Sequence, residues 1–235
     1  MDEYKPDFKK IYTIANEVLV SSHTIMDIPF SLKLFIKEET DIALCTYQKV
    51  ILKSNEEDIS FGSEDAVLSE KDGMYIIFYN NQAFIKRKIW SIAHELGHFY
   101  AGHDLKAAEK CKALYDVQEV EANFFAAQFL MPDQLIVDLS KRGCDITNYF
   151  LQDKFKVSGA AAEKRLKTLR KVIDYKECFP DQDFNEAIRL KFKDFLDRTA
   201  PYKKRYGSSL EEEEEMQKER DTWLNNRNQN SRSKY

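Results

Sequence analysis

The segment His94-Glu95-Leu96-Gly97-His98 lies inside a helix-like run, residues 83–101. Because four residues are just over one helical turn, the two histidines point to the same side of the helix. Two imidazoles so placed can bind one Zn²⁺ ion, while the glutamate between them is free to act as a base. The segment predicts His94 and His98 as metal ligands and Glu95 as the catalytic residue. The alternative is a pair of inert histidines that match the pattern by chance.

The other side of this helix is apolar. At about 100° per residue, one stripe is predicted to face the core, and it consists of Ile85, Ile89, Ile92, Leu96 and Phe99. His94 and His98 lie roughly opposite that stripe, beside Trp90 and Ala101. A solvated face would carry Lys, Glu and Gln, so a second wall of protein is expected to cover the histidines.

A third ligand is expected from a second helix, residues 117–130, which ends before Pro132. Glu119 shares its side with Asn123 and Ala126, and small residues there allow a close approach of another helix. Glu121 points about 160° away. The pattern therefore predicts Glu119, and not Glu121, as the third zinc ligand, with Asn123 as a supporting group.

These two motifs together resemble the ImmA/IrrE family of zinc metallopeptidases. The likeness rests on HELGH followed by Glu119-Val-Glu-Ala-Asn-Phe-Phe-Ala-Ala-Gln-Phe-Leu-Met-Pro132, and it extends over about residues 25–173. It implies a zinc site formed by His94, His98 and Glu119, with Glu95 as base. It also implies a protein substrate, a helix-turn-helix repressor whose cleavage derepresses mobile-element or stress genes. The group that steadies the oxyanion is left open among Tyr100, His103 and Tyr149.

The expected fold class is α+β, with a zincin-like core of helices and a small antiparallel sheet. Residues 42–52 and 74–80 are predicted strands, and residues 53–72 are expected to form a loop or a weak hairpin. The strand at 74–80 is either an edge along which an extended peptide pairs or an ordinary buried strand. Three regions are predicted: a metallopeptidase domain at 1–140, a helix-turn-helix-like region at 141–176, and a helix with a charged tail at 177–235.

Other helices are expected from apolar periodicity. Residues 7–20 form an amphipathic helix, and a second begins at Asp27 with Pro29 in its first turn. Residues 102–116 are expected to be a polar connection. Further helices are predicted at 146–155, at 159–173 and from Asp183 to just before Pro201.

The helix-turn-helix outline at 146–173 raises a competing hypothesis, a regulatory module that binds a repressor or DNA around an idle or structural zinc site. Residues 154–176 hold eight Lys and Arg against two acidic residues. The basic residues of the second helix spread around it instead of following one edge: Lys164, Arg165, Lys167, Arg170 and Lys171. We therefore favour a role in the fold or in partner docking over DNA recognition.

Composition restricts the classes of partner and the cell compartment expected for this protein. Lys and Arg number 36 against 40 Asp and Glu, so the net charge of −4 gives no general signal for polyanion binding. The charged N-terminus lacks an apolar signal segment, and no apolar run is long enough to span a bilayer. Four scattered cysteines without a CxxC pair favour reduced thiols. We expect a cytoplasmic protein with no membrane partner.

Overall fold

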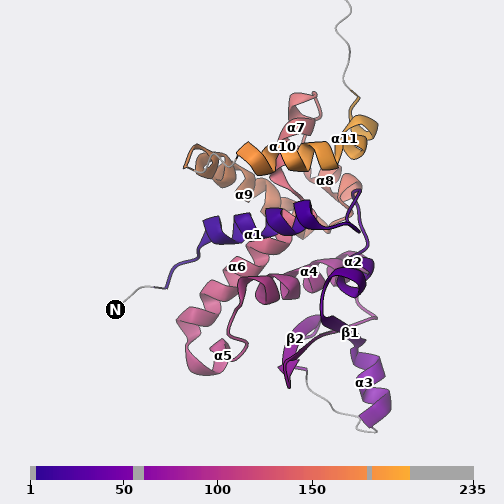
Figure 1. Ribbon diagram of the computed structural model, residues 1–235, viewed down its shortest axis with the longest axis vertical. Coiled ribbons are helices and arrows are strands. Elements are labelled where there is room, and N and C mark those ends of the chain that lie inside the picture. Colours follow the sequence, from indigo (N-terminus) through magenta and orange to yellow (C-terminus); the bar gives the residue numbers. More distant parts are fainter. Residues whose placement is uncertain (1–3, 55–60, 179–181, 202–235) are drawn as a thin grey trace, which may run out of the picture. The chain divides into compact units, whose positions relative to one another are not determined.

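The computed structural model describes residues 4–54, 61–178 and 182–201 (Figure 1). The chain divides into two compact units, residues 1–200 and 201–235. The first unit is a mixed α and β structure with one small sheet and many helices, as predicted at the level of fold class. The charged tail after Gly207 lies outside the described residues.

The sheet has three strands, β1 (Ile42–Thr46), β2 (Ala66–Lys71) and β3 (Met74–Tyr79), in the order β1-β3-β2. β2 and β3 form an antiparallel hairpin, whereas β1 runs parallel to β3. The predicted purely antiparallel sheet is therefore wrong for one of its two pairings. A parallel pair needs a crossover connection, and here α3 (Tyr47–Ser54) and β2 lie between the two strands in the chain.

The edge role considered for residues 74–80 is also wrong. β3 is the central strand, and both of its edges are hydrogen-bonded to neighbours. β2 is an edge strand, although its residues were expected to form only a loop or a weak hairpin. The first predicted strand was too long, because Thr46 Oγ1 accepts a hydrogen bond from Lys49 N and starts α3 at a point where β-formers continue in the sequence.

The remaining helices are α1 (Phe8–Ser21), α2 (Leu32–Glu39), α4 (Ile85–Ala101), α5 (Ala107–Lys110), α6 (Lys112–Leu130), α7 (Asp133–Lys141), α8 (Asn148–Lys154), α9 (Gly159–Cys178), α10 (Gln182–Lys191) and α11 (Lys193–Thr199). The single helix predicted from Asp183 to just before Pro201 is two helices, α10 and α11, which separate at Phe192. Ser31 caps α2 through its hydroxyl, so the predicted start at Asp27 was wrong. α7 was not predicted, and the expected polar connection at 102–116 contains α5 and the first turn of α6.

α4 and α6 lie in the middle of this unit, with α1 against α6 (Figure 1). The core side of α4 was predicted correctly for Ile92 and Leu96, which are buried, but Ile85 at the start of the helix is 60% exposed. α8 and α9 contribute Leu151 and Ala162 to the same hydrophobic core. The helix-turn-helix-like region thus packs as part of the first unit.

Across the described residues, every helix is too short or too polar to cross a membrane. Cys45, Cys111 and Cys144 are free thiols. The side chain of Cys178 lies outside the described part of the chain.

Candidate metal centre

The site is built where α4 crosses α6, and a glycine sets their separation. A Cβ atom added to Gly97 would lie 2.9 Å from both the Cα and the carbonyl oxygen of Ala122. It would also lie 3.1 Å from the Cβ of Phe125. No side chain fits between the two backbones, so Gly97 inside the HELGH segment is what lets α6 reach the histidines.

At this crossing His94, His98 and Glu119 form a group that could hold a metal ion, with one ligand atom from each lying within 4.8 Å of the others. The Nε2 atoms of His94 and His98 are 3.1 Å apart, and each lies 3.4 Å from a different oxygen of Glu119. Tetrahedral bonds of about 2.0–2.2 Å place two zinc ligands about 3.3–3.6 Å apart. The three donors therefore match the spacing of a zinc site with three protein ligands.

The two carboxylates of α6 have separate surroundings. Glu119 faces the histidines, and hydrogen bonds from His94 and His98 lower its pKa from the ordinary value. Glu121 lies away from this group and accepts from His103 Nε2 at 2.9 Å and from the backbone N–H of Asp7 at 2.6 Å. Only 12% of the Glu121 side chain is exposed, so this carboxylate makes a packing contact of its own on another side of α6.

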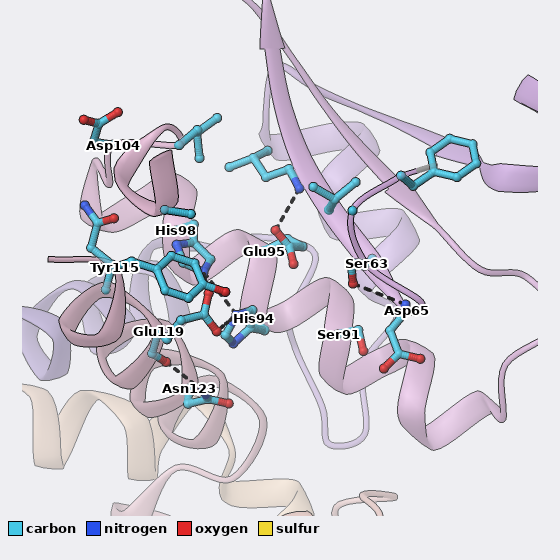
Figure 2. A pocket seen from close by; sticks show the side chains of 18 of the residues that line it. Ser63, Asp65, Ser91, His94, Glu95, His98, Asp104, Tyr115, Glu119 and Asn123 are labelled. Atoms are coloured by element: carbon cyan, nitrogen blue, oxygen red, sulfur yellow. Dashed lines mark hydrogen bonds and ion pairs between the residues drawn. The ribbon is translucent and has the colours of Figure 1, made fainter. Parts of the chain in front are cut away.

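Glu95 lies beside the ligand group and is buried (Figure 2). Its Oε2 accepts a hydrogen bond of 2.8 Å from the backbone N–H of Leu68 in β2. Burial raises the pKa of its carboxyl, and the histidine charges oppose this effect. A carboxylate with a raised pKa is a stronger proton acceptor, which is the property a general base needs.

The third histidine of this region, His103, is held behind the ligands. Its Nδ1 is 2.9 Å from the Nδ1 of His98, and its Nε2 contacts Glu121. Only 5% of its side chain is exposed. Burial lowers the pKa of His103 to about 4, and the nearby His98 contributes a smaller part of this shift. The imidazole of His103 is therefore neutral at neutral pH.

The ligand group opens into a cleft of about 670 Å³. One wall is the segment from Phe61 to Leu68 that leads into β2, and the other is formed by α5 and α6 (Figure 2). Leu68 directs its N–H to Glu95 and not to β3, so the free edge of β2 faces this cleft. An extended peptide laid along β2 would therefore pass next to Glu95 and the histidines.

Tyr115 lines the cleft beside Glu119 and was missed from the sequence (Figure 2). It stands one helical turn before Glu119, so its position on the same face of α6 was a usable signal. The three residues considered for the oxyanion do not line this cleft: Tyr149 is 78% exposed on α8, Tyr100 stacks on Phe125, and His103 contacts Glu121. Asn123 does line the cleft, but it donates to the backbone carbonyl of Glu119 and not to its carboxylate.

Comparison with known proteins identifies the family of this chain. The family model of the IrrE N-terminal-like domain, Peptidase M78, matches residues 50–167, half of the chain. The chain belongs to this family, as its resemblance to ImmA/IrrE proteins predicted.

Among solved structures, a Mycobacterium tuberculosis transcriptional regulator matches with a TM-score of 0.42 and 14% sequence identity. The match covers 66% of this chain and 45% of that protein, so the chain spans less than half of its length. No curated protein matches the sequence.

Proposed function

We propose that this protein is a zinc-dependent endopeptidase in which His94, His98 and Glu119 hold the metal and Glu95 is the base. The observation that carries this proposal is the ligand group itself: three donors at zinc spacing, with a buried carboxylate beside them at the floor of a cleft. Cysteine-rich four-ligand sites are more typical of structural zinc, whereas three ligands leave a position open for chemistry.

Each residue has a role in peptide hydrolysis. A zinc ion in such a site lowers the pKa of water towards roughly 7 and polarises a carbonyl group. Glu95 accepts the proton of the attacking water and returns it to the leaving amine. The Leu68 N–H holds one oxygen of Glu95, so the other oxygen is left to face the reacting water. Tyr115 replaces the three earlier candidates as the group that steadies the oxyanion.

The substrate is proposed to be an extended segment of a protein that pairs with β2. Edge strands bind extended peptides through their backbone groups, and such pairing depends little on the peptide's side chains. The resemblance to ImmA/IrrE proteins implies that the substrate is a helix-turn-helix repressor. Cleavage would then derepress mobile-element or stress genes.

The test incubates the wild-type protein or Glu95→Gln with zinc and a helix-turn-helix repressor, the proposed substrate. Glu95→Gln keeps the shape of the side chain but removes the base. The wild type should cleave its partner at a defined bond, seen by mass spectrometry, while the variant binds equal zinc and leaves the partner intact. Cleavage by Glu95→Gln at the wild-type rate would refute the assignment of the base.

The same experiment separates the competing class of function, a regulatory module that binds a repressor or DNA without cleaving it. If both proteins relieve repression equally and the repressor stays intact, the module is non-proteolytic. The structure reduces the basic surface that first raised this alternative: Arg165 is fully buried, and Lys167 pairs with Glu163.

A further inference from the structure

The contacts behind His98 form a continuous chain that the ligand assignment does not explain. His98 Nδ1 lies 2.9 Å from His103 Nδ1, and His103 Nε2 lies 2.9 Å from Glu121 Oε2. The other oxygen of Glu121 accepts from the backbone N–H of Asp7, the residue that caps α1. Four groups from three parts of the sequence are thus linked in one line that ends at the candidate metal.

The contacts fit one order of donors and acceptors when His98 binds a metal ion. Nε2 of His98 faces His94 and Glu119, so a metal bound there leaves the proton of this ring on Nδ1. Nδ1–H then donates to His103 Nδ1 across the 2.9 Å contact. His103 in turn carries its own proton on Nε2 and donates it to the Glu121 carboxylate, which only accepts.

We infer that His103 and Glu121 are positioning residues that fix the metal-binding tautomer and orientation of His98, with the N-terminus of α1 holding Glu121 in place. This inference rests on the proposed metal site and adds to it a residue pair outside the ligand set. Asp7 also lies outside residues 50–167, so the chain beyond the matched family domain contributes to the site.

The experiment measures zinc affinity, because this quantity does not depend on knowing the substrate. Competition with a chromophoric chelator is applied to wild type, His103→Phe, His103→Asn and Glu121→Ala. His103→Phe and Glu121→Ala should bind zinc about 10–100-fold more weakly, the usual cost of removing a partner behind a metal ligand. His103→Asn should recover most of the affinity, since its amide oxygen can accept from His98 Nδ1–H.

Matched controls exist elsewhere in the chain. His23 contacts Glu39 at 3.6 Å, and its side chain is 75% exposed, so His23→Phe removes a histidine–carboxylate pair that does not line the cleft. Glu163→Ala removes an exposed carboxylate of α9. Both controls should bind zinc like the wild type. Circular dichroism shows which variants are folded, and Glu121→Ala provides the test if His103→Phe does not fold.

A second readout addresses the tautomer directly. In ¹⁵N imidazole spectra of the zinc-loaded protein, His103 should carry its proton on Nε2 and none on Nδ1. A proton on His103 Nδ1, or zinc affinities of folded His103→Phe and Glu121→Ala within twofold of wild type, would overturn the inference. Failure of the wild type itself to bind zinc would instead refute the proposed metal site on which the inference rests.

Discussion

Glu119 and Glu121 show how far two residues on one helix can differ in role. Glu119 lies 3.4 Å from both histidine Nε2 atoms, whereas Glu121 contacts His103 and the backbone of Asp7. Their separation on α6 follows from helical geometry, because a step of two residues turns the side chain about 160° away.

Substitution of a direct ligand should reduce the zinc affinity of the protein more than substitution of a supporting carboxylate. Glu119→Ala removes one of three donors, so we expect it to lose most of the bound zinc, measured by elemental analysis after dialysis. Asp116→Ala is the matched control, since Asp116 is an exposed carboxylate of the same helix paired with Lys112. The ligand assignment is wrong if Glu119→Ala keeps stoichiometric zinc while Glu121→Ala loses it.

Tyr115 lines the cleft beside Glu119 and is the residue proposed to steady the oxyanion. Burial and then the charge of Glu119 raise its pKa, so its hydroxyl keeps its proton and can donate at neutral pH. Tyr115→Phe should lower kcat by about 10²–10³-fold, the cost of losing one oxyanion donor, while zinc affinity changes by less than about tenfold. Steady-state cleavage of the repressor proposed as substrate measures this effect. An unchanged kcat would show that another group steadies the oxyanion.

At the scale of elements, the crossing of α4 and α6 places the ligands. Gly97→Ala puts a methyl group 2.9 Å from the backbone of Ala122, so α6 must move. We expect a loss of about 1–3 kcal/mol in the free energy of unfolding, from overpacking, together with weaker zinc binding as Glu119 is displaced. Urea denaturation and chelator competition measure the two effects.

The control for this substitution is Gly159→Ala at the start of α9. Its added Cβ would meet only the amide end of Gln152, at 3.3 Å, and that side chain can move. This variant should bind zinc like the wild type. Equal zinc affinity in Gly97→Ala would show that the close approach of the helices does not position Glu119.

α9 is attached to the rest of the unit by a buried arginine. Arg165 is fully buried, and its Nη2 donates to Gln128 Oε1 at 2.6 Å. Gln128 in turn donates to Asn16 of α1 and to Gln134 of α7. One of the basic residues that suggested DNA binding thus belongs to a polar cluster joining α1, α6, α7 and α9.

Removing this arginine should destabilise the protein. We expect Arg165→Ala to lower the free energy of unfolding by about 3 kcal/mol, because it leaves a cavity and unpaired buried polar groups. The neighbouring Lys164 is exposed, so Lys164→Ala should change stability by less than about 0.5 kcal/mol. Equal urea midpoints for the two variants would mean that the arginine contributes nothing to the fold.

For the whole molecule, metal binding should be linked to unfolding. The ligands come from α4 and α6, which pack together only in the native state, so zinc binds the folded chain preferentially. At a free zinc concentration 100 times the Kd, binding stabilises by about 2.7 kcal/mol. This should raise the Tm by about 5–10 °C for a unit of this size.

Differential scanning calorimetry with and without zinc, after removal of metal by a chelator, measures this shift. Glu119→Ala is the control and should show little or no rise. An equal rise in this variant would place the stabilising zinc at a different site.

The sequence by itself determined the local pattern of the site. The spacing of His94 and His98 and the direction of Glu121 depend on periodicity within one helix, and the strand predicted at 74–80 depends on its β-branched and aromatic residues. These features survive folding because residues three or four apart on a helix, or two apart on a strand, keep their relative direction whatever packs against them.

The tertiary structure decided what depends on contacts between distant segments. Only the assembled sheet shows that β2, and not the strand at 74–79, offers an edge to the cleft. Only packing places His103 and Glu121 behind His98 and buries Arg165 of α9 against Gln128 of α6. Periodicity gives the direction of a side chain within its own element, but the partner it meets is set by which other elements fill the space around it, and their positions follow from the packing of the whole core.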